Sequence, residues 1–421
     1  MNMREMKDSG IEWIGSIPAN WEVHPVYFYF TERKNKNIFG AEQNLLSLSY
    51  GKVIRKNINT VGGLLPESFN TYNIIEANDI VIRPTDLQND KRSLRTGLCK
   101  EHGIITSAYI VLKPISGFNV NYVHYLLHTY DIMKVFYNMG NGVRQGLNYS
   151  EFSKLMIFIP PIAEQNAIAK YLDNECSEVD ALVSDIQHQI EALEEYKRSV
   201  ITEAVTKGLD PDVEMRDSGI AWVGDIPAHW LVEKVKFHLQ RNEPRNPGDK
   251  QVLSVYREYG VIPKDSRDDN HNVTSEDTSN YKYVVPGNLV INKMKAWQGS
   301  MGVSEYEGIV SPAYFIYKFT DNQIMPKYLH YLFRSCYKDE FRRISGGIRE
   351  GQWDLSPYEF SNTLLLIPPT DEQNRIVSYI DARISEIEFA ITEKKQQIET
   401  IEEYKKSLIF EYVTGKKEVQ A

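Results

Sequence analysis

Two short polar stretches carry side chains of the kind that nucleases use to hold a metal ion and activate water. Residues 268–271 read Asp-Asp-Asn-His, and residues 86–91 place two aspartates ahead of a lysine. Carboxylates serve this purpose when several of them converge on one ion. Isolated acidic clusters in polar loops are usually solvated turns, so these stretches alone do not predict a nuclease.

The motifs of other common enzymes are missing from the sequence. Gly415-Lys416 lacks the upstream glycine of a phosphate-binding loop, and there is no Gly-x-Gly-x-x-Gly turn, no Gly-x-Ser-x-Gly elbow and no Cys/His cluster with metal spacing. The Asn/Asp-Pro-Pro-Tyr/Phe motif of amino-methyltransferases is also absent, because the Pro-Pro pairs here precede Ile162 and Thr370. We therefore expect no catalytic residue, no metal site and no cofactor in this chain, and a role in binding or scaffolding.

The composition is that of a globular protein. With 421 residues, 42% of them hydrophobic, the chain is long enough for two cores of ordinary size. No apolar run is long enough to span a membrane, and the N-terminus lacks the apolar core of a signal peptide. The three cysteines, Cys99, Cys176 and Cys336, have no metal-type spacing and cannot all pair. These features favour the cytoplasm, with free thiols.

The net charge of −9 does not exclude nucleic acid as a partner, because the acidic residues are concentrated. Residues 161–210 hold 4 Lys+Arg against 11 Asp+Glu, and residues 368–421 hold 8 against 11. The remaining segments are close to neutral, at 17 against 14 for residues 1–160 and 19 against 21 for residues 211–367. A local basic groove is therefore compatible with the acidic total.

The chain consists of two copies of one unit. Residues 6–21 and 215–230 are identical at 11 of 16 positions, 209 residues apart. The sequence Ile-Pro-Pro with a following Glu-Gln-Asn recurs at 159–166 and 367–374, 208 residues apart. A period near 200 residues is far too long for a solenoid or propeller repeat, so each copy is a domain-sized module.

Each copy predicts the same order of elements. The tryptophans near the Ile-Pro turn (Trp13, Trp21, Trp222 and Trp230) favour a packing role over ligand contact. Short strands follow, separated by Gly, Asn, Asp and Pro. They are expected at 79–82, 104–105 and 109–112 in the first copy and at 288–291, 309–310 and 314–317 in the second. Helical patches are expected at 122–137 and 328–341, with His124 and His330 as half-buried helix residues.

Each copy closes with a long helix that carries a heptad seam. Steps of four and three alternate along the apolar or near-apolar positions for four repeats. These positions are Leu172, Cys176, Val179, Val183, Ile186, Ile190, Leu193, Lys197 and Val200, and then Ile380, Ile384, Ile387, Ile391, Lys394, Ile398, Ile401, Lys405 and Leu408. The lysines are expected to weaken packing locally and to fix the register. Antiparallel pairing of the two helices is favoured over the alternative, in which each helix packs only on its own domain.

The predicted fold class is therefore α+β, with two tandem β-rich domains, each followed by a long helix, and with the two helices paired as an antiparallel coiled coil. The expected division is a first domain at 1–160, a central helical spacer at 161–208, a second domain at 209–368 and a C-terminal helical spacer at 369–415.

This organisation resembles the specificity subunit of Type I restriction-modification systems over essentially the whole chain. The resemblance is carried by the opening at Asp8 to Trp21, by the Ile-Pro-Pro-x-x-Glu-Gln elements at Ile159 to Gln165 and Ile367 to Gln373, and by the duplicated heptads. It implies two target-recognition domains that read the two halves of a bipartite, asymmetric DNA site, with the paired helices as a ruler for the unread gap.

The resemblance also implies partners and explains the missing catalytic motifs. Besides double-stranded DNA, these are two methyltransferase subunits that bind S-adenosylmethionine and methylate adenine N6, and two motor-nuclease subunits that use ATP and Mg and cut unmethylated DNA. The methyltransferase would flip the adenine out of the duplex, while this chain only selects it.

The polar loops that follow the predicted strands in each copy are the best candidates for DNA contact. Arg and Lys bind phosphates and guanine, and Asn and Gln read adenine. Glycines at 140–146 and 346–351 would let backbone amides approach a phosphate. The candidates are Arg83, Lys91, Arg92, Arg95, Arg144 and Gln145 in the first domain, and Lys293, Lys295, Gln298, Arg349, Gln352 and Trp353 in the second. For each one, the alternative is an ordinary solvated surface residue.

Two further interpretations of the whole chain stay open at this point. One is a pseudo-dimeric coiled-coil scaffold whose β-rich modules bind protein or glycan rather than DNA. The other is an orphan specificity protein that has no functioning nuclease partner.

Overall fold

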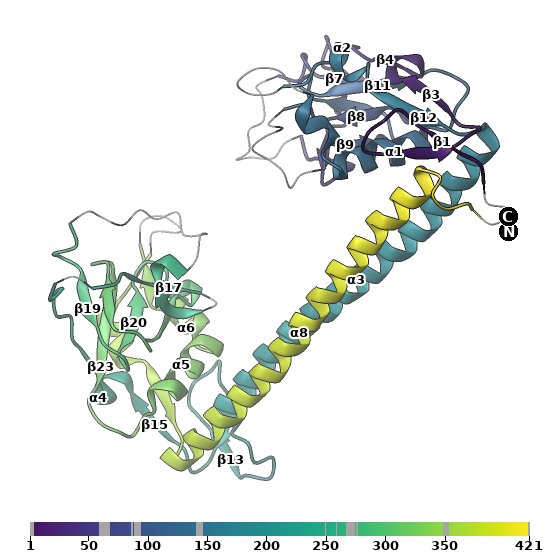
Figure 1. Ribbon diagram of the computed structural model, residues 1–421. Coiled ribbons are helices and arrows are strands. Elements are labelled where there is room, and N and C mark those ends of the chain that lie inside the picture. The colour runs from purple at the N-terminus through teal and green to yellow at the C-terminus, as the bar shows by residue number, and fades with distance from the viewer. Residues whose placement is uncertain are drawn as a thin grey trace. The chain divides into compact units, whose positions relative to one another are not determined.

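The computed structural model (Figure 1) consists of two compact units, and each unit combines segments that are distant in sequence. The first comprises Met1–Ile186 and Lys395–Ala421, and the second comprises Gln187–Lys394. Each unit thus contains one globular repeat, the first half of the long helix that follows it, and the second half of the other long helix. The structure describes residues 4–58, 68–85, 87, 94–139, 146–248, 250–257, 259–266, 274, 277–347 and 353–419.

The first unit is built on a four-stranded antiparallel sheet in the order β4-β11-β8-β9. Its strands are β4 (Phe30–Glu32), β8 (Ile80–Ile82), β9 (Thr96–Leu98) and β11 (Ile110–Pro114). Four two-stranded pairs surround this sheet. They are β1 (Met6–Asp8) with β2 (Ser16–Pro18), β3 (Glu22–Pro25) with β12 (Met156–Ile159), β5 (Leu46–Ser49) with β6 (Lys52–Arg55), and β7 (Asn73–Ile75) with β10 (Gly103–Ile105).

The second unit repeats this topology and has one further pair, β24 with β25, among its described residues. Its four-stranded sheet has the order β16-β23-β20-β21, made of β16 (Leu239–Arg241), β20 (Leu289–Asn292), β21 (Met301–Val303) and β23 (Tyr314–Phe319). The surrounding pairs are β13 (Met215–Asp217) with β14 (Asp225–Pro227), β15 (Leu231–Lys234) with β26 (Leu364–Ile367), β17 (Leu253–Tyr256) with β18 (Gly260–Pro263), β19 (Lys282–Val284) with β22 (Gly308–Val310), and β24 (Ser345–Gly346) with β25 (Asp354–Leu355).

One of the two central strands of each sheet, β8 or β20, is apolar on both faces because a core lies on each side of it. In β8, Ile80 and Ile82 join the main core of the first unit, while Val81 joins a smaller cluster on the opposite face. In β20, Leu289 and Val290 divide in the same way between the two cores of the second unit. Side chains alternate between faces along a strand, so a short, fully apolar run fits a doubly covered strand.

The helices are α1 (Val120–Ile132), α2 (Tyr149–Phe152) and α3 (Ile162–Lys207), then α4 (Val235–His238), α5 (Pro326–Ser335), α6 (Lys338–Arg343), α7 (Pro357–Asn362) and α8 (Thr370–Val413). Single 3₁₀ turns occur at η1 (Val26–Phe28), η2 (Val135–Asn138), η3 (Lys264–Ser266) and η4 (Ala296–Gln298). His124 and His330 are half-buried on α1 and α5, as predicted.

Both predicted helical patches are interrupted in the structure. The first breaks at Lys134, which adopts a left-handed conformation with φ 60° between α1 and η2. The second breaks at Cys336 and Tyr337, between α5 and α6. A single residue outside the right-handed region ends the backbone hydrogen-bond pattern of a helix, and apolar periodicity does not reveal it.

The Glu-Gln pair of the repeated motif lies in the first turn of each long helix. Glu164 accepts a hydrogen bond from the indole N–H of Trp21 at 3.1 Å, and Glu372 does the same for Trp230 at 3.1 Å. Gln165 accepts from the backbone N–H of Asn119 at the start of α1. The motif therefore ties the repeated tryptophan and the short helix to the start of the long helix.

The end of the other long helix completes each core. Leu408, Ile409 and Val413 of α8 belong to the core of the first unit, and Ala204 and Val205 of α3 belong to the core of the second. In each unit, a buried tyrosine on the short helix donates a hydrogen bond to the end of this second long helix. We call these two bonds the closing contacts.

Tyr122 on α1 donates its hydroxyl hydrogen bond to the Val413 carbonyl at 3.0 Å, and Tyr328 on α5 donates to the Val205 carbonyl at 3.3 Å. Gly415, just after α8, has φ +69°, and a Cβ there would lie 2.5 Å from Pro18. Glycine is needed at this position both for the left-handed conformation and for the close approach to the repeated motif.

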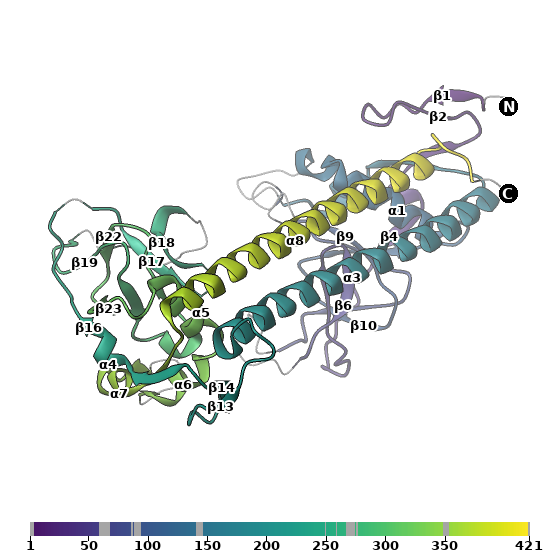
Figure 2. The ribbon, with the colours of Figure 1, turned by 90° about the horizontal axis from the view of Figure 1, so that it is seen from below.

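The two long helices pair antiparallel within each unit, and Figure 2 shows α3 and α8 side by side. Every predicted seam residue is buried or half-buried. Lys405 pairs with Asp180 at 2.6 Å in the first unit, and Lys197 pairs with Glu388 at 2.7 Å in the second. Glu388 lies 208 residues after Asp180 and Lys405 lies 208 after Lys197, so these are two copies of one register-fixing ion pair.

The predicted fold class is confirmed, with two β-rich domains, each followed by a long helix, and antiparallel pairing of the helices. The proposed limits between recognition domains and spacers stay a prediction. Cys99, Cys176 and Cys336 are free thiols.

The closing contacts predict that Val413 and Val205 support different units. Both side chains are 0% exposed. Val413→Ala should destabilise the first unit by about 2 kcal/mol, from lost burial and a residual cavity. Hydrogen exchange measured by mass spectrometry should then rise in peptides around Tyr122 and stay unchanged around Tyr328. Val205→Ala is the matched control and should give the reverse. Equal loosening of both units in either variant would contradict this assignment.

Candidate nucleic-acid interface

Two loops that carry predicted DNA contacts meet at the same edge of each unit. In the second unit, the Leu355 N–H donates to the Lys293 carbonyl at 2.8 Å, which joins the chain entering α7 to the β20–β21 connection. In the first unit, the Leu147 N–H donates to the Pro84 carbonyl at 3.0 Å, which joins the chain entering α2 to the β8–β9 connection. One backbone bond therefore brings corresponding loops together in both repeats.

In the second unit, the described part of this edge is a cluster of cationic, amide and aromatic side chains around η4. The Lys293 ammonium lies 3.2 Å from the carboxylate of Asp354. The rings of Trp297 and Trp353 are in contact, with centroids 5.5 Å apart. Gln298 accepts a hydrogen bond from Arg257 at 3.0 Å, which leaves the amide N–H groups of Gln298 to act as donors elsewhere.

Lys295 differs from Lys293 in its exposure. It is exposed at the start of the η4 turn, where its carbonyl accepts from the backbone N–H of Gln298 at 3.0 Å and of Ser300 at 3.2 Å. The backbone is thus fixed while the ammonium group extends into solvent. Of the candidates in this unit, Lys293, Lys295, Gln298 and Trp353 are brought together.

In the first unit, Arg83 and Arg95 lie at the two ends of the β8–β9 connection. The Arg83 N–H donates to the Arg95 carbonyl at 2.8 Å, and Arg83 is half-buried. Arg95 is 0% exposed, and its guanidinium donates to the carbonyl oxygens of Thr85 and Arg83. In this structure Arg95 is bound to the chain just after β8, and its role toward DNA stays a prediction.

The carboxylate of Asp131 accepts from the backbone N–H groups of Arg95 and Thr96. Burial raises the pKa of Asp131 to about 6, although these bonds oppose the rise. These two bonds therefore fix the start of β9 to α1.

Six candidates lie outside the residues that the structure describes, and their roles stay predictions. They are Lys91, Arg92, Arg144, Gln145, Arg349 and Gln352. The acidic stretch at 268–271 and most of 86–91 also lie outside.

Sequence reasoning missed Arg257 and Trp297, which complete the η4 cluster. Arg257 follows β17 and lies two residues before Tyr259-Gly260. An apolar strand followed by glycine is a turn signal that places such a residue at a hairpin tip. Trp297 stands between two predicted contacts, Lys295 and Gln298, and its sequence position alone could have drawn attention to it.

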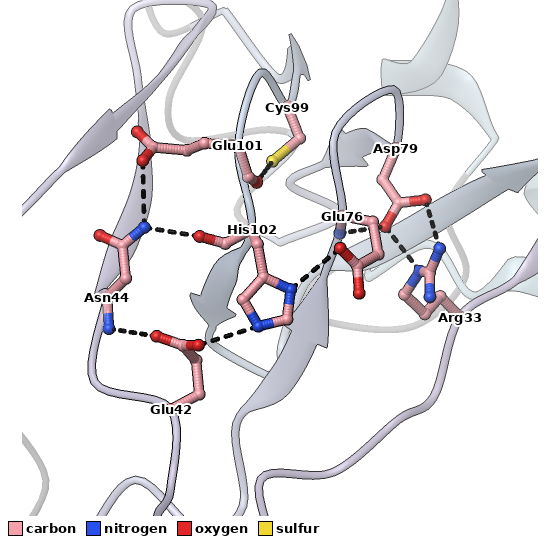
Figure 3. A network of polar contacts seen from close by, with 8 residues as sticks. All are labelled: Arg33, Glu42, Asn44, Glu76, Asp79, Cys99, Glu101 and His102. Atoms are coloured by element: carbon pink, nitrogen blue, oxygen red, sulfur yellow. Dashed lines mark hydrogen bonds and ion pairs between the residues drawn. The ribbon is translucent and has the colours of Figure 1, made fainter.

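A polar network in the first unit fastens the base of the β5–β6 hairpin (Figure 3). Glu42 and Glu76 lie on either side of the His102 ring, at 2.8 Å from Nε2 and 2.9 Å from Nδ1. Asn44 donates to the His102 carbonyl at 2.6 Å and to the Glu101 carboxylate at 3.1 Å. The network thus joins the segment that leads into β5 to the start of β10.

The electrostatics of this network favour the charged forms of its members. A hydrogen bond to Glu76 raises the pKa of His102 above its usual value of 6.5, and the charges of Glu76 and Glu42 add to the effect. The backbone N–H of Asn44 holds the pKa of Glu42 below its usual range. A hydrogen bond from Arg55 on β6 likewise lowers the pKa of Glu101.

The second unit has a corresponding polar network at the base of its β17–β18 hairpin, with Glu307 where the first unit has His102. Gln251 donates to the Glu307 carbonyl at 2.9 Å, where Asn44 donates to the His102 carbonyl in the first unit. The Glu307 carboxylate is bound by Lys250 at 2.5 Å and by the hydroxyl of Tyr283 at 2.6 Å. The anchored hairpin base is therefore a shared feature of the frame, although its chemistry has diverged.

Within the described ranges, no group of three or more His, Cys, Asp or Glu side chains is arranged to hold a metal ion. None of the helices in those ranges is both long and apolar enough to cross a membrane.

Comparison with known proteins gives a consistent result. A family model described as "Type I restriction modification DNA specificity domain" matches residues 95–192 and 238–400. A protein of Methanocaldococcus jannaschii, named as the specificity subunit of type I restriction enzyme MjaX, is 22% identical over 426 residues, which cover 96% of this chain and 95% of that protein. The specificity subunit of type I restriction enzyme EcoKI from Escherichia coli is 23% identical over 292 residues, covering 64% of this chain and 60% of its own length.

Among solved structures, a chain from a study of complex assembly and conformational transition of the type I R-M system has a similar fold. Its TM-score is 0.64 at 11% identity, with 95% of this chain and 99% of that chain covered.

The raised pKa of His102 predicts a pH-dependent contribution to stability. The imidazolium form is favoured by folding, so its contribution is fully present below about pH 6.5 and is lost as pH rises through the higher folded-state pKa. His102→Gln should therefore lower the melting temperature at about pH 6, and the difference from wild type should shrink toward about pH 9. Thermal melts of both proteins across this range measure it. A difference that stayed constant or grew with pH would be the contrary result.

Proposed function

The chain belongs to the family of type I restriction-modification DNA specificity proteins, and from that premise we propose that each unit reads one half of a bipartite, asymmetric DNA site. As the specificity subunit, it selects the DNA on which a multisubunit methyltransferase and endonuclease acts. The DNA-reading surface of each unit is the edge where the two loops meet, which we call the reading edge.

The observation that carries this proposal is a repeated frame with different loop contents. One backbone bond joins the loops in both units, from Leu147 to Pro84 and from Leu355 to Lys293. Arg83 and Arg95 in the first unit occupy the positions of Asn292 and Ser300 in the second, since each pair is joined by the same N–H to carbonyl bond. Different side chains on one scaffold provide different base preferences, so the two half-sites should differ in sequence.

The η4 cluster supplies each kind of contact that duplex DNA needs. The exposed ammonium of Lys295 suits a phosphate, and the amide of Gln298 suits the edge of an adenine. Arg257 orients Gln298 through the bond to its carbonyl oxygen, so the amide N–H groups face away from the guanidinium. The Trp297–Trp353 pair provides an apolar surface beside them.

The chain itself is proposed to be non-catalytic. Two methyltransferase subunits carrying S-adenosylmethionine would methylate adenine N6, and two motor-nuclease subunits using ATP and Mg would cut unmethylated DNA. We place the complex in the cytoplasm, with DNA as its target. No finding favours the alternative of a coiled-coil scaffold without DNA specificity.

Gln298→Ala tests the assignment of one half-site to the second unit. In the host, methylation-sensitive sequencing should show relaxed preference at one base pair, by about 1–3 kcal/mol, in one half of the motif. The other half should be unchanged, because it is read by the first unit. Gln323→Ala, an exposed glutamine in the same unit, is the control. Relaxation of both halves, or of neither, would count against the proposal.

Lys295→Ala tests for a phosphate contact. Binding of the reconstituted methyltransferase complex to its site should weaken, and the slope of log affinity against log salt should fall by about 1. Lys318→Ala removes an exposed lysine from β23 of the same unit and should leave the slope unchanged. An equal change in both variants would show that only overall charge matters.

A further inference from the structure

Each unit presents an exposed tyrosine at the tip of the hairpin that follows its anchored base. Tyr50 lies between β5 and β6 and is 82% exposed, and Tyr259 lies directly before β18 and is 57% exposed. The two tyrosines are 209 residues apart, the same spacing as the repeated opening motif. Each is followed by a glycine with positive φ, +76° at Gly51 and +72° at Gly260.

Tyr50 adopts a backbone conformation that an aromatic residue rarely occupies. Its φ is 45°, and with Gly51 it forms a two-residue turn in which both φ angles are positive. Asn or Gly is the usual choice at such a first position, because the Cβ of a bulkier residue comes too close there to the following carbonyl oxygen. The tyrosine is thus retained where local conformation disfavours it, and its exposed ring adds nothing to a core. Strain of this kind points to a role of the side chain itself.

Both hairpin tips lie beside the reading edge. In the first unit, a Cβ on Gly51 would lie 3.1 Å from the side chain of Leu94, the residue that precedes Arg95. In the second unit, Arg257 at the tip bonds Gln298 of η4 at 3.0 Å. Arg334 on α5 fastens this side further by donating to the carbonyls of Arg257 and Met301.

The hairpins are also held firmly at their bases. Short parallel bridges join Leu45 to Ile104 and Val252 to Ile309, next to the polar fastenings around His102 and Glu307. Each hairpin is thus held both at its base and beside its tip. A side chain at such a tip is well placed for a defined contact, because the hairpin loses little conformational freedom on binding.

The hairpins differ in length, since Ser49 pairs with Lys52 in the first unit and Tyr256 pairs with Gly260 in the second, but both carry a Tyr-Gly pair at the tip. This shared pair indicates what the tyrosines contact. The reading loops differ between the units, and on the proposed function they face half-sites of different sequence. The feature that the two half-sites share is the sugar-phosphate backbone. A residue type that both hairpin tips carry, exposed and placed beside loops that differ, therefore suits the backbone rather than a base.

We propose that the hydroxyl groups of Tyr50 and Tyr259 each donate a hydrogen bond to a phosphate oxygen, one in each half-site, and so set the position of each unit on the duplex. This inference rests on the proposed function of the units as DNA-reading modules. It adds a contact that is independent of sequence and common to both halves.

Tyr50→Phe and Tyr259→Phe remove only the hydroxyl groups and test the proposal. Reconstituted methyltransferase complexes are titrated with a duplex that carries the complete site, and the host motif is determined by methylation-sensitive sequencing. Each variant should bind about tenfold more weakly, as expected for one hydrogen bond to a charged group, with the motif unchanged. The double variant should show the product of the two losses. Tyr306→Phe is the control, because Tyr306 is 39% exposed and its counterpart in the other repeat, Glu101, is not a tyrosine.

The contrary outcomes are distinct from one another. Wild-type affinity in both Phe variants, with loss only on Tyr50→Ala and Tyr259→Ala, would assign the effect to the ring and overturn the proposal. A changed base in the motif would overturn it too, since it would show base reading. If the wild-type complex itself does not prefer the site, the proposed function fails before the tyrosines are tested.

Discussion

The closure of each unit by the end of a helix that started in the other repeat is the constraint on which the rest of the structure depends. Tyr122 and Tyr328 donate to the last carbonyls of α8 and α3, and the valines that carry those carbonyls are fully buried. Each core is incomplete without this distant segment. The antiparallel pairing of α3 and α8 within a unit follows directly, because each helix must end where the other begins. The register is then fixed by the Lys405–Asp180 and Lys197–Glu388 pairs.

Within this single chain, the constraint separates the frame that repeats in both units from the loops that differ between them. Residues that repeat 208 or 209 positions apart are largely those that build the closure, such as Trp21 and Trp230 with their glutamate partners. The loops at the reading edge contribute little to it and have diverged. A frame that is stabilised elsewhere can accept new loop side chains at little cost in stability, which suits the proposed reading of two different half-sites. The Tyr-Gly pairs at Tyr50 and Tyr259 are exceptions, since both units carry them at a hairpin tip and they do not contribute to the closure.

Much of this architecture was predictable because it is encoded locally. Heptad spacing predicted both long helices, and every seam residue is at least half-buried. Short apolar runs predicted the central strands for the same reason. Closure was not predictable, since Tyr122 and Val413 are 291 positions apart and neither segment signals the other. The recurrence of Val-Thr at 205–206 and 413–414 was the available hint. The loops at the reading edge could be chosen from their composition, but the burial of Arg95 could not, because sequence does not show that nearby carbonyls will surround a guanidinium.

Methylation-sensitive sequencing of the host genome, with and without this coding sequence, tests the central claim most directly. The account predicts that deletion removes N6-methyladenine from one bipartite motif with unequal halves and leaves other methylation intact. An unchanged methylation pattern in a host whose partner subunits are active, or loss of a motif with two identical halves, would contradict it.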